Sequence, residues 1–504
     1  MLFNSYEFIF LFMPVVFAGF FIIARKSHQG SIAWLSLASI FFYAYWSIYA
    51  LPVIVASICV NYWLGLHLSN PGFRYRQPLL VFAITLNLFT LGYFKYANFF
   101  IANTNALRNA MGIEPIGSLD VILPIGISFF TFTQIAFLVD SYQDKVKERS
   151  FLQYLLFVSF FPHLLAGPVL HHKQMMPQFS DPKTFSIDYE KIKLGIAIFT
   201  IGLAKKVIIA DSLSGSVDAI FNSSTQNHLL NFWVTWLGAL SYTFQLYFDF
   251  SGYSDMAVGA SLFFGIWLPF NFNSPFKATS IIDFWQRWHM TLTKYVGEYL
   301  YAPIALKFMR LGQGKTALIE ILYSLVIPTV LIFLILGLWH GANWTYVVFG
   351  GMHGLYIVIN HLWRMVFPLP NKKNKKMQAY RGIKKIAGWS LTFISVIIAN
   401  VMFRADSIST ACEIYKGMLG LNGFNLIAVR DSFLGLRMLT IILTLSFLII
   451  LTMPSIPTML SISEKNTRTT LKLISPASGI ILGIIFIVSI MSLDNKSPFL
   501  YFQF

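Results

Sequence analysis

Three histidines lie in one apolar and aromatic part of the sequence, between Asp283 and Asn360. His289 ends the run Asp-Phe-Trp-Gln-Arg-Trp-His, His340 lies in Trp-His-Gly-Ala-Asn-Trp, and His353 lies in Gly-Gly-Met-His-Gly. An imidazole can bind a metal ion, accept a proton or hold a structural hydrogen bond. Within hydrocarbon, such a polar group is costly unless it finds a partner or a wet cavity. This stretch is therefore the first candidate for a functional site.

The spacing of these histidines argues against a metal site. Neither the pair His340 and His353 nor the pair His353 and His361 has the four-residue separation that places two ligands on one helix face, and no carboxylate accompanies them. The sequence also lacks the Gly-x-Ser-x-Gly motif of a serine nucleophile. A structural hydrogen bond remains an alternative role for each histidine. We expect no metal.

Aromatic, amide and basic side chains near the histidines are candidates for the walls of a site. The indoles of Trp285 and Trp339 combine apolar surface with a hydrogen-bond donor, and Asn343 belongs to the same Trp-rich motif. Arg287 either pairs with Asp283 on a solvated face or binds an anion such as a nucleotide diphosphate, because guanidinium can bind phosphate through two hydrogen bonds. The sequence leaves both roles of the arginine open.

The composition places these residues in a membrane protein. Of the 504 residues, 56% are hydrophobic and 12% are charged, and the mean hydropathy is +0.65. Runs of roughly 20 apolar residues recur along the chain, which is the length that crosses a bilayer as a helix. We expect an all-α, polytopic transmembrane helical bundle with about 11–13 spans. The net charge of +16 indicates basic cytoplasmic loops, and we expect no nucleic-acid binding.

Basic residues between the apolar runs predict the orientation of the chain. The first run, Tyr6 to Ala24, is followed by two basic residues, which predicts a retained span that ends in the cytoplasm. Residues Ile32 to Leu68 predict a hairpin of two spans, bent near Pro52. The loop from Lys372 to Lys385 holds seven bases and no acid, the strongest cytoplasmic signal in the chain. With C-terminal spans at 386–491, both termini are predicted outside.

Two segments of the first half are predicted to be irregular. The Asn-rich stretch from Ala97 to Asp120 has one base and reads as an outer loop. Prolines and glycines within residues 151–170 predict broken or re-entrant helices, because proline frees backbone groups that neighbours or water must satisfy. The adjacent pair His171 and His172 precedes a lysine, which favours a position at a membrane interface.

A polar stretch in the middle of the chain predicts another break. Residues Asp249 to Asp255 (Asp-Phe-Ser-Gly-Tyr-Ser-Asp) separate two apolar runs, 229–250 and 256–269, and read as a turn between spans. The two aspartates are expected to cap helices or to pair with bases such as Lys277 or Arg287.

The motifs together resemble the membrane-bound O-acyltransferase family. The sequence looks most like the branch that contains the alginate O-acetylation and peptidoglycan O-acetyltransferase membrane subunits. The resemblance covers nearly the whole chain and rests on a specific set of motifs. These are Leu123–Phe132, Phe160–Pro168, Tyr247–Asp255, Asn271–Leu292, Leu338–Trp344, Gly350–Gly354 and the ending Pro498–Phe504.

The resemblance implies an enzyme whose histidines line a tunnel through the membrane. It implies one domain, 1–504, with a catalytic core at about 120–363. By similarity, His340 is the catalytic base and His289 is the second active-site residue. His353 is expected to support them, and the side chains expected to line the tunnel are Trp339, Asn343, Trp285 and Arg287.

The function that the resemblance implies is O-acyl transfer across a bacterial inner membrane. A cytoplasmic thioester, expected to be acyl-CoA and specifically acetyl-CoA, supplies the acyl group without any bound cofactor. The acceptor is a cell-envelope or secreted polysaccharide, and the expected partner is an extracytoplasmic acyltransferase of the serine-esterase type. The aromatic tail, 492–504, is expected to help dock that partner. The alternatives are a D-alanyl transferring relative that uses a carrier-protein thioester, and a non-enzymatic transporter.

Overall fold

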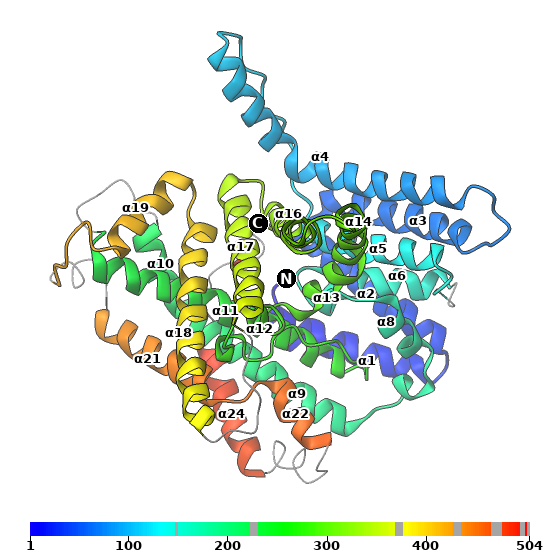
Figure 1. Ribbon diagram of the computed structural model, residues 1–504. Coiled ribbons are helices and arrows are strands. Elements are labelled where there is room, and N and C mark those ends of the chain that lie inside the picture. The colour runs from blue at the N-terminus through cyan, green and yellow to red at the C-terminus, as the bar shows by residue number, and fades with distance from the viewer. Residues whose placement is uncertain are drawn as a thin grey trace.

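The protein is a bundle of helices, seen in a computed structural model (Figure 1). The structure describes residues 1–146, 150–221, 230–367, 376–426, 435–464, 476–493 and 499–500. Within these ranges no strand is present, which confirms the expected all-α class. The expected seven-base loop begins outside the described residues.

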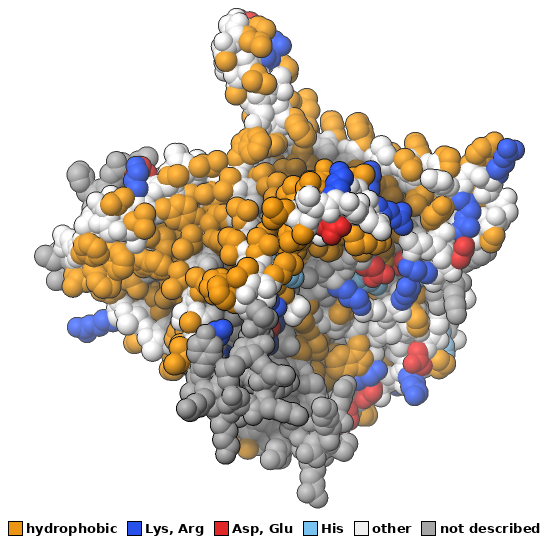
Figure 2. Space-filling view, in the orientation of Figure 1, with side chains coloured by type: hydrophobic (Ala, Val, Ile, Leu, Met, Phe, Trp, Pro, Cys, Tyr) orange, Lys and Arg blue, Asp and Glu red, His pale blue; other side chains and the backbone are white. Residues whose placement is uncertain are grey.

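Six helical segments of the described chain are long and apolar enough to cross a membrane: Glu7–Ala24, Ile48–Leu68, Arg76–Ala110, Ala317–His340, Gly382–Arg404 and Leu436–Leu460. A shorter apolar helix covers Ala477–Met491. These segments confirm a polytopic membrane protein, whereas the total of 11–13 spans stays a prediction. Figure 2 shows hydrophobic side chains over α17 (Trp344–Val366) and α18 (Lys376–Arg404), as expected of surfaces that face lipid.

Of the two spans predicted between Ile32 and Leu68, one, Ile48–Leu68, is among the segments long and apolar enough to cross a membrane. The chain runs through the π-helical turn η1 (Glu7–Phe12) and α1 (Met13–Ala24) into α2 (His28–Trp46), and α3 (Leu51–Leu68) returns. Ser27 starts α2 by accepting a hydrogen bond from the Gly30 N–H, which satisfies one of the helix's free donors. Pro52 occupies the first turn of α3, where a missing N–H costs little. The bend near Pro52 is therefore confirmed.

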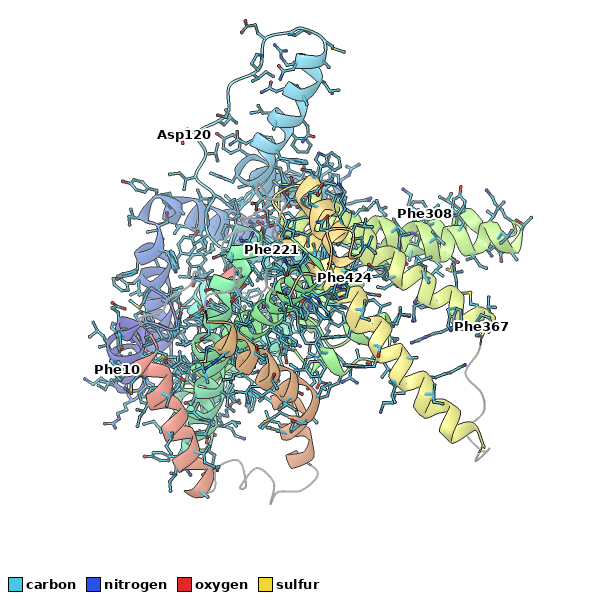
Figure 3. The ribbon with its side chains drawn as sticks, turned by 90° about the vertical axis from the view of Figure 1, so that its left-hand side faces the viewer. Phe10, Asp120, Phe221, Phe308, Phe367 and Phe424 are labelled. Atoms are coloured by element: carbon cyan, nitrogen blue, oxygen red, sulfur yellow. The ribbon has the colours of Figure 1, made fainter. Side chains whose placement is uncertain are left out.

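Helix α4 (Arg76–Ala110) contradicts the predicted outer loop. It continues through much of the segment 97–120 and, at 35 residues, is about 50 Å long, well beyond the hydrocarbon thickness. Figures 1 and 3 show its end projecting from the bundle, with Asp120 on the returning chain. The Asn98 amide pairs with both backbone groups of Leu119, and the Asn105 amide does the same with Ile116. The asparagines thus bind the return chain to the helix.

The predicted helix breaks are present in residues 151–170. Helix α6 (Phe151–Ser159) stops before α7 (Phe161–Leu164), and Pro162 lies in the first turn of α7. The following loop turns tightly, because a side chain at Gly167 would collide with the backbone of His163. Helix α8 (His172–Ser180) follows.

Helix α11 (Phe232–Leu262) is continuous, so the predicted polar turn at 249–255 is wrong. Asp249 pairs with Lys206 at 2.6 Å and Asp255 pairs with Lys205 at 2.6 Å, rather than with the two bases expected from sequence. Gly252 lets α11 approach the neighbouring backbone closely, a common feature of helix contacts in membranes. Polar residues can therefore lie inside this helix because tertiary partners satisfy them.

The remaining helices complete the bundle (Figure 1). They are α5 (Ile127–Tyr142), α9 (Tyr189–Ala204), η4 (Lys205–Ala210), α10 (Asp211–Phe221), α12 (Ile281–Trp285), α13 (Met290–Val296), η6 (Gly297–Tyr301), α14 (Ala302–Gly312), α15 (Ala317–Ile321), η7 (Leu322–Val326), α16 (Ile327–His340), α19 (Ile408–Met418), α21 (Leu436–Thr452), α22 (Ile456–Glu464) and α24 (Pro476–Met491). Helices α9, α10, α18, α19 and α21 pack against α11. Short 3-10 turns lie at Ile48–Ala50, Pro182–Phe185 and Pro275–Lys277.

The described part of the C-terminal tail is buried against α11. The Leu500 N–H donates to the Asp249 carboxylate at 3.0 Å, and the Phe499 ring stacks on Tyr253 with centroids 4.4 Å apart. The rest of the tail lies largely outside the described residues. Phe499 and Leu500 are thus held by the bundle, and the docking role expected for the tail stays a prediction.

Candidate active site

A small cavity in the core has two of the three histidines in its wall. Its volume is about 20 Å³, which is room for about one water molecule. The wall comes from α11, α12, the segment after α12, α16, α17 and α18, and it is mainly aromatic. The lining residues are Leu246, Phe284, Trp285, Trp288, His340, Phe349, His353, Val396, Asn400 and Phe403.

His340 is the last residue of α16 and is almost fully buried. The last carbonyls of a helix have no partner within the helix, so a buried helix end needs donors from elsewhere. Here α4 provides them. The Tyr96 hydroxyl donates to the Leu338 carbonyl at 3.0 Å, and the Lys95 ammonium donates to the carbonyls of Trp339 at 2.6 Å and His340 at 3.3 Å.

Lys95 is a site residue that the sequence reasoning missed. Its ammonium group also lies 3.4 Å from the Ser128 hydroxyl and within electrostatic range of the His340 ring. A single cation directly after an apolar run is a functional signal in a membrane protein. Its partners lie 244 and 245 residues away along the chain, so only the fold reveals them.

Two glycines set the distance between the helices that carry His340 and His353. A side chain at Gly337 on α16 would collide with the backbone of Tyr346, and one at Gly350 on α17 would collide with the Phe333 carbonyl. Gly350, in the Gly-Gly-Met-His-Gly motif that carries His353, therefore permits close helix–helix contact.

His353 is oriented by Trp285, and both residues line the cavity. The indole N–H of Trp285 donates to Nδ1 of His353 at 3.2 Å, and the Phe349 ring lies 4.7 Å from the imidazole. Because Nδ1 accepts this hydrogen bond, a neutral His353 carries its proton on Nε2. The ring can thus donate a hydrogen bond to a bound group.

His289 has an unusual backbone conformation. Its φ of 43° is left-handed, which costs an ordinary residue about 1–2 kcal/mol. The Asn271 side chain contacts Nδ1 of His289 at 3.2 Å, and the Asn271 carbonyl accepts from the Met290 N–H at 2.8 Å. Strain that neighbours hold in place is often found at functional sites. Asn271 is thus a second positioning residue that the sequence reasoning did not select.

The three histidines lie near one another, but only two of them line the cavity. His289 and His353 both lie within electrostatic range of His340. The lining of the cavity includes His340 and His353 and does not include His289. Within the described ranges, no three His, Cys, Asp or Glu side chains are grouped so that they could hold a metal ion.

The other predicted site residues shape the surroundings. Trp339 stacks on Phe132 with ring centroids 5.2 Å apart. Asn343 starts α17 by accepting from the Thr345 N–H. Arg287 donates to Asp283 at 2.7 Å, which matches the ion-pair role left open by the sequence.

The fold and this cavity define an integral membrane protein with a histidine-lined interior. A model of the membrane-bound O-acyltransferase family (MBOAT) matches residues 32–402. The chain belongs to this family, as its motifs suggested. The fold and family together define a membrane acyltransferase.

Three curated relatives show which acyltransferases the chain is similar to. The chain is 41% identical to the peptidoglycan O-acetyltransferase of Helicobacter pylori, over 84% of this chain and 81% of that protein. It is 35% identical to the probable alginate O-acetylase AlgI of Pseudomonas putida, over 100% of both. Identity to the teichoic acid D-alanyltransferase of Streptococcus thermophilus is 25%, over 58% of this chain and 71% of that protein.

Proposed function

We propose that the protein moves an acetyl group from a cytoplasmic thioester to a hydroxyl group of a cell-envelope or secreted polysaccharide. The observation that carries this proposal is the aromatic cavity with His340 and His353 in its wall. The relatives named for peptidoglycan and alginate O-acetylation support the acetyl group and the class of acceptor.

In the proposed mechanism His340 is the general base. The imidazole takes the proton of the acceptor hydroxyl as its oxygen attacks the thioester carbonyl. The C–O bond forms, the C–S bond breaks, and the sulfur leaves as a thiol after the His340 imidazolium returns the proton to it. His353, held by Trp285, donates a hydrogen bond to the oxyanion, because its Nε2 carries the proton. His289 orients the acceptor.

The surroundings of His340 suit a reactive thioester. Aromatic rings of Trp339, Phe349 and Phe403 lie 4.9 Å, 6.2 Å and 5.2 Å from the imidazole. Such a wall excludes water, which strengthens hydrogen bonds and limits hydrolysis of the donor. Because the cavity has room for about one water, substrates require it to widen. We propose that Trp285 and Phe403 move as the site opens.

Donor identity and the His340 role are tested together. Purified protein is incubated with labelled acetyl-CoA or with an acetylated carrier protein, together with an oligosaccharide acceptor. We expect transfer from acetyl-CoA, loss of transfer in His340→Ala, and near-native transfer in the control His361→Ala on α17. Transfer only from the carrier protein would favour the mode of the D-alanyl relative. Transfer retained by His340→Ala would overturn the mechanism.

We further propose an inner-membrane location with both termini outside, and an extracytoplasmic serine-esterase-like acyltransferase as the partner. The basic segments after the first span support this orientation. Single cysteines placed at the exposed Glu7 and at Arg108 are expected to react with an impermeant thiol reagent in intact cells. Labelling only after cell lysis would contradict the orientation. Co-purification of such an acyltransferase with the tagged protein tests the partner.

A further inference from the structure

A second polar cluster lies away from the histidine cavity, at the end of α5 that we expect on the cytoplasmic side. It joins Asp140 of α5 to His172 of α8, His171 just before α8, and Tyr299 of η6. Asp140, His171 and His172 are 1%, 6% and 2% exposed, so the sequence-based placement of the histidines at an interface misses how deeply they are buried. Nothing in the proposed mechanism uses this cluster.

The hydrogen bonds of the cluster assign a role to each atom. The Tyr299 hydroxyl donates to the Asp140 carboxylate at 3.0 Å, and Nδ1 of His172 lies 3.0 Å from the same oxygen. Because the Tyr299 hydrogen points to Asp140, the Tyr299 oxygen accepts from Nδ1 of His171 at 3.3 Å. This fixes the proton of His171 on Nδ1, so Nε2 becomes an acceptor.

The atom that suggests a binding role for the cluster is Nε2 of His171. Among the residues that the structure describes, it has no hydrogen-bond partner. A buried polar atom without a partner costs about 1–3 kcal/mol, so it calls for an explanation such as a bound group. Burial also lowers the pKa of His171, which favours the neutral ring. The site thus presents a fixed hydrogen-bond acceptor.

Three exposed lysines lie around the cluster, and the carboxylate of Glu298 is also within electrostatic range of His171. Lys145 lies 3.8 Å from Asp140, Lys173 lies within electrostatic range of Asp140, and Lys294 lies within range of His171. Figure 2 shows charged side chains gathered on the right of the molecule, near α8 and α14, whereas the left side is mainly hydrophobic. A rim of lysines is suited to a phosphate group.

Aromatic contacts connect the cluster to the histidine cavity. The centroid distances are 6.5 Å from His171 to Tyr295, 4.7 Å from Tyr295 to Phe132, 5.2 Å from Phe132 to Trp339 and 4.9 Å from Trp339 to His340. Along α5, Ser128 beside Lys95 is separated from Asp140 by about 18 Å. The cluster and the cavity therefore lie at two ends of one packed path.

We propose that the cluster of Asp140, His171, His172 and Tyr299 binds the phosphopantetheine arm of the acyl donor. Nε2 of His171 accepts a hydrogen bond from an amide N–H of the arm, and the lysine rim binds its phosphate. The arm is comparable in length to about five extended residues, roughly 17 Å, which is close to the separation of about 18 Å between Asp140 and Ser128 along α5. His171 is a binding residue and Tyr299 a positioning residue. This inference rests on the proposed function, and the arm is common to CoA and to carrier proteins.

The direct test compares donor kinetics in full-length protein in detergent. His171→Phe keeps a stacked ring but removes the acceptor, and we expect about a tenfold rise in the donor KM with kcat within about twofold. His171→Gln places an amide oxygen near Nε2 and is expected to recover most of the donor affinity. The matched control is His67→Phe, because the His67 ring bonds only to the Trp63 carbonyl of its own helix. No change is expected there.

Donors with and without a phosphate group distinguish the role of His171 from that of the lysines. Acetyl-CoA, acetylated carrier protein and acetyl-pantetheine, which lacks the phosphate, are compared in each variant. His171→Phe is expected to weaken every donor that the native protein uses, whereas Lys294→Ala weakens only phosphate-bearing donors. Weakening of acetyl-CoA alone identifies CoA as the source of the arm, and weakening of the carrier protein alone identifies the carrier.

The outcomes distinguish this inference from the proposed function. Native protein that transfers from no thioester would contradict the proposed function. Native transfer with an unchanged donor KM in His171→Phe would overturn the donor site alone. If His171→Phe does not fold, Tyr299→Phe decides, because it keeps the ring but releases Nδ1 of His171. An unchanged donor KM in that variant would also overturn the site.

Discussion

The histidine cavity and the α5 cluster hold their histidines in opposite ways. His340 is surrounded by aromatic rings, and its position is fixed largely by backbone carbonyls bound to α4. In the α5 cluster, the rings themselves are held: His172 lies 3.0 Å from the Asp140 carboxylate, and His171 hydrogen-bonds to the Tyr299 hydroxyl. An aromatic wall keeps water away from the reacting groups, whereas a hydrogen-bonded ring suits binding. The difference predicts kcat effects in the cavity and KM effects in the cluster.

The largest predicted effect is a loss of kcat when the histidine cavity is altered. His340→Ala removes the proposed base, and we expect kcat to fall by about 10²–10⁴-fold. Donor binding should remain, because the α5 cluster is untouched. Steady-state transfer measures kcat, and equilibrium dialysis with CoA measures binding. A kcat within tenfold of native would contradict the assignment of the base.

Lys95→Met tests whether the backbone of His340 must be held by α4. Removing a charged donor from two buried carbonyls is expected to lower kcat by about 10–100-fold, as each such hydrogen bond contributes about 1.5–3 kcal/mol. Lys191→Met is the matched control, because the Lys191 ammonium donates to the Gly265 carbonyl far from the cavity. Equal kcat losses in both variants would mean a general loss of stability.

Trp285→Phe sharpens the role of His353. It keeps an aromatic ring in the wall but removes the N–H that binds Nδ1, and we expect kcat to fall about fivefold. Trp389→Phe, which removes an indole bond to the Phe276 carbonyl, serves as the control. An unchanged kcat in Trp285→Phe would show that His353 needs no orientation.

The smallest effect on activity is expected at the projecting end of α4. Replacing Asn98 and Asn105 by Ala removes the bonds to the return chain, at about 1 kcal/mol per hydrogen bond. Hydrogen exchange in residues 110–120 is expected to quicken, with transfer in detergent unchanged. Exchange at the native rate would show that the asparagines do not hold the return chain against α4.

The sequence predicted the membrane class and the three histidines because hydropathy and motif chemistry are local signals. It failed where distant side chains satisfy polar groups. Asp249 looked like a turn residue, since the pairing of its carboxylate with Lys206 appears only in the fold. Lys95 was passed over for the same reason. Which histidine rings line the cavity is likewise visible only in the fold, and the roles that we propose for them depend on it.

The central claim is that His340 carries out acyl transfer within the membrane. The most direct measurement uses proteoliposomes with the protein inserted in one orientation, labelled acetyl-CoA on the cytoplasmic face and an oligosaccharide acceptor on the other. We predict label on the acceptor with native protein and with His361→Ala, and none above background with His340→Ala. Equal labelling by the native protein and His340→Ala would contradict the account.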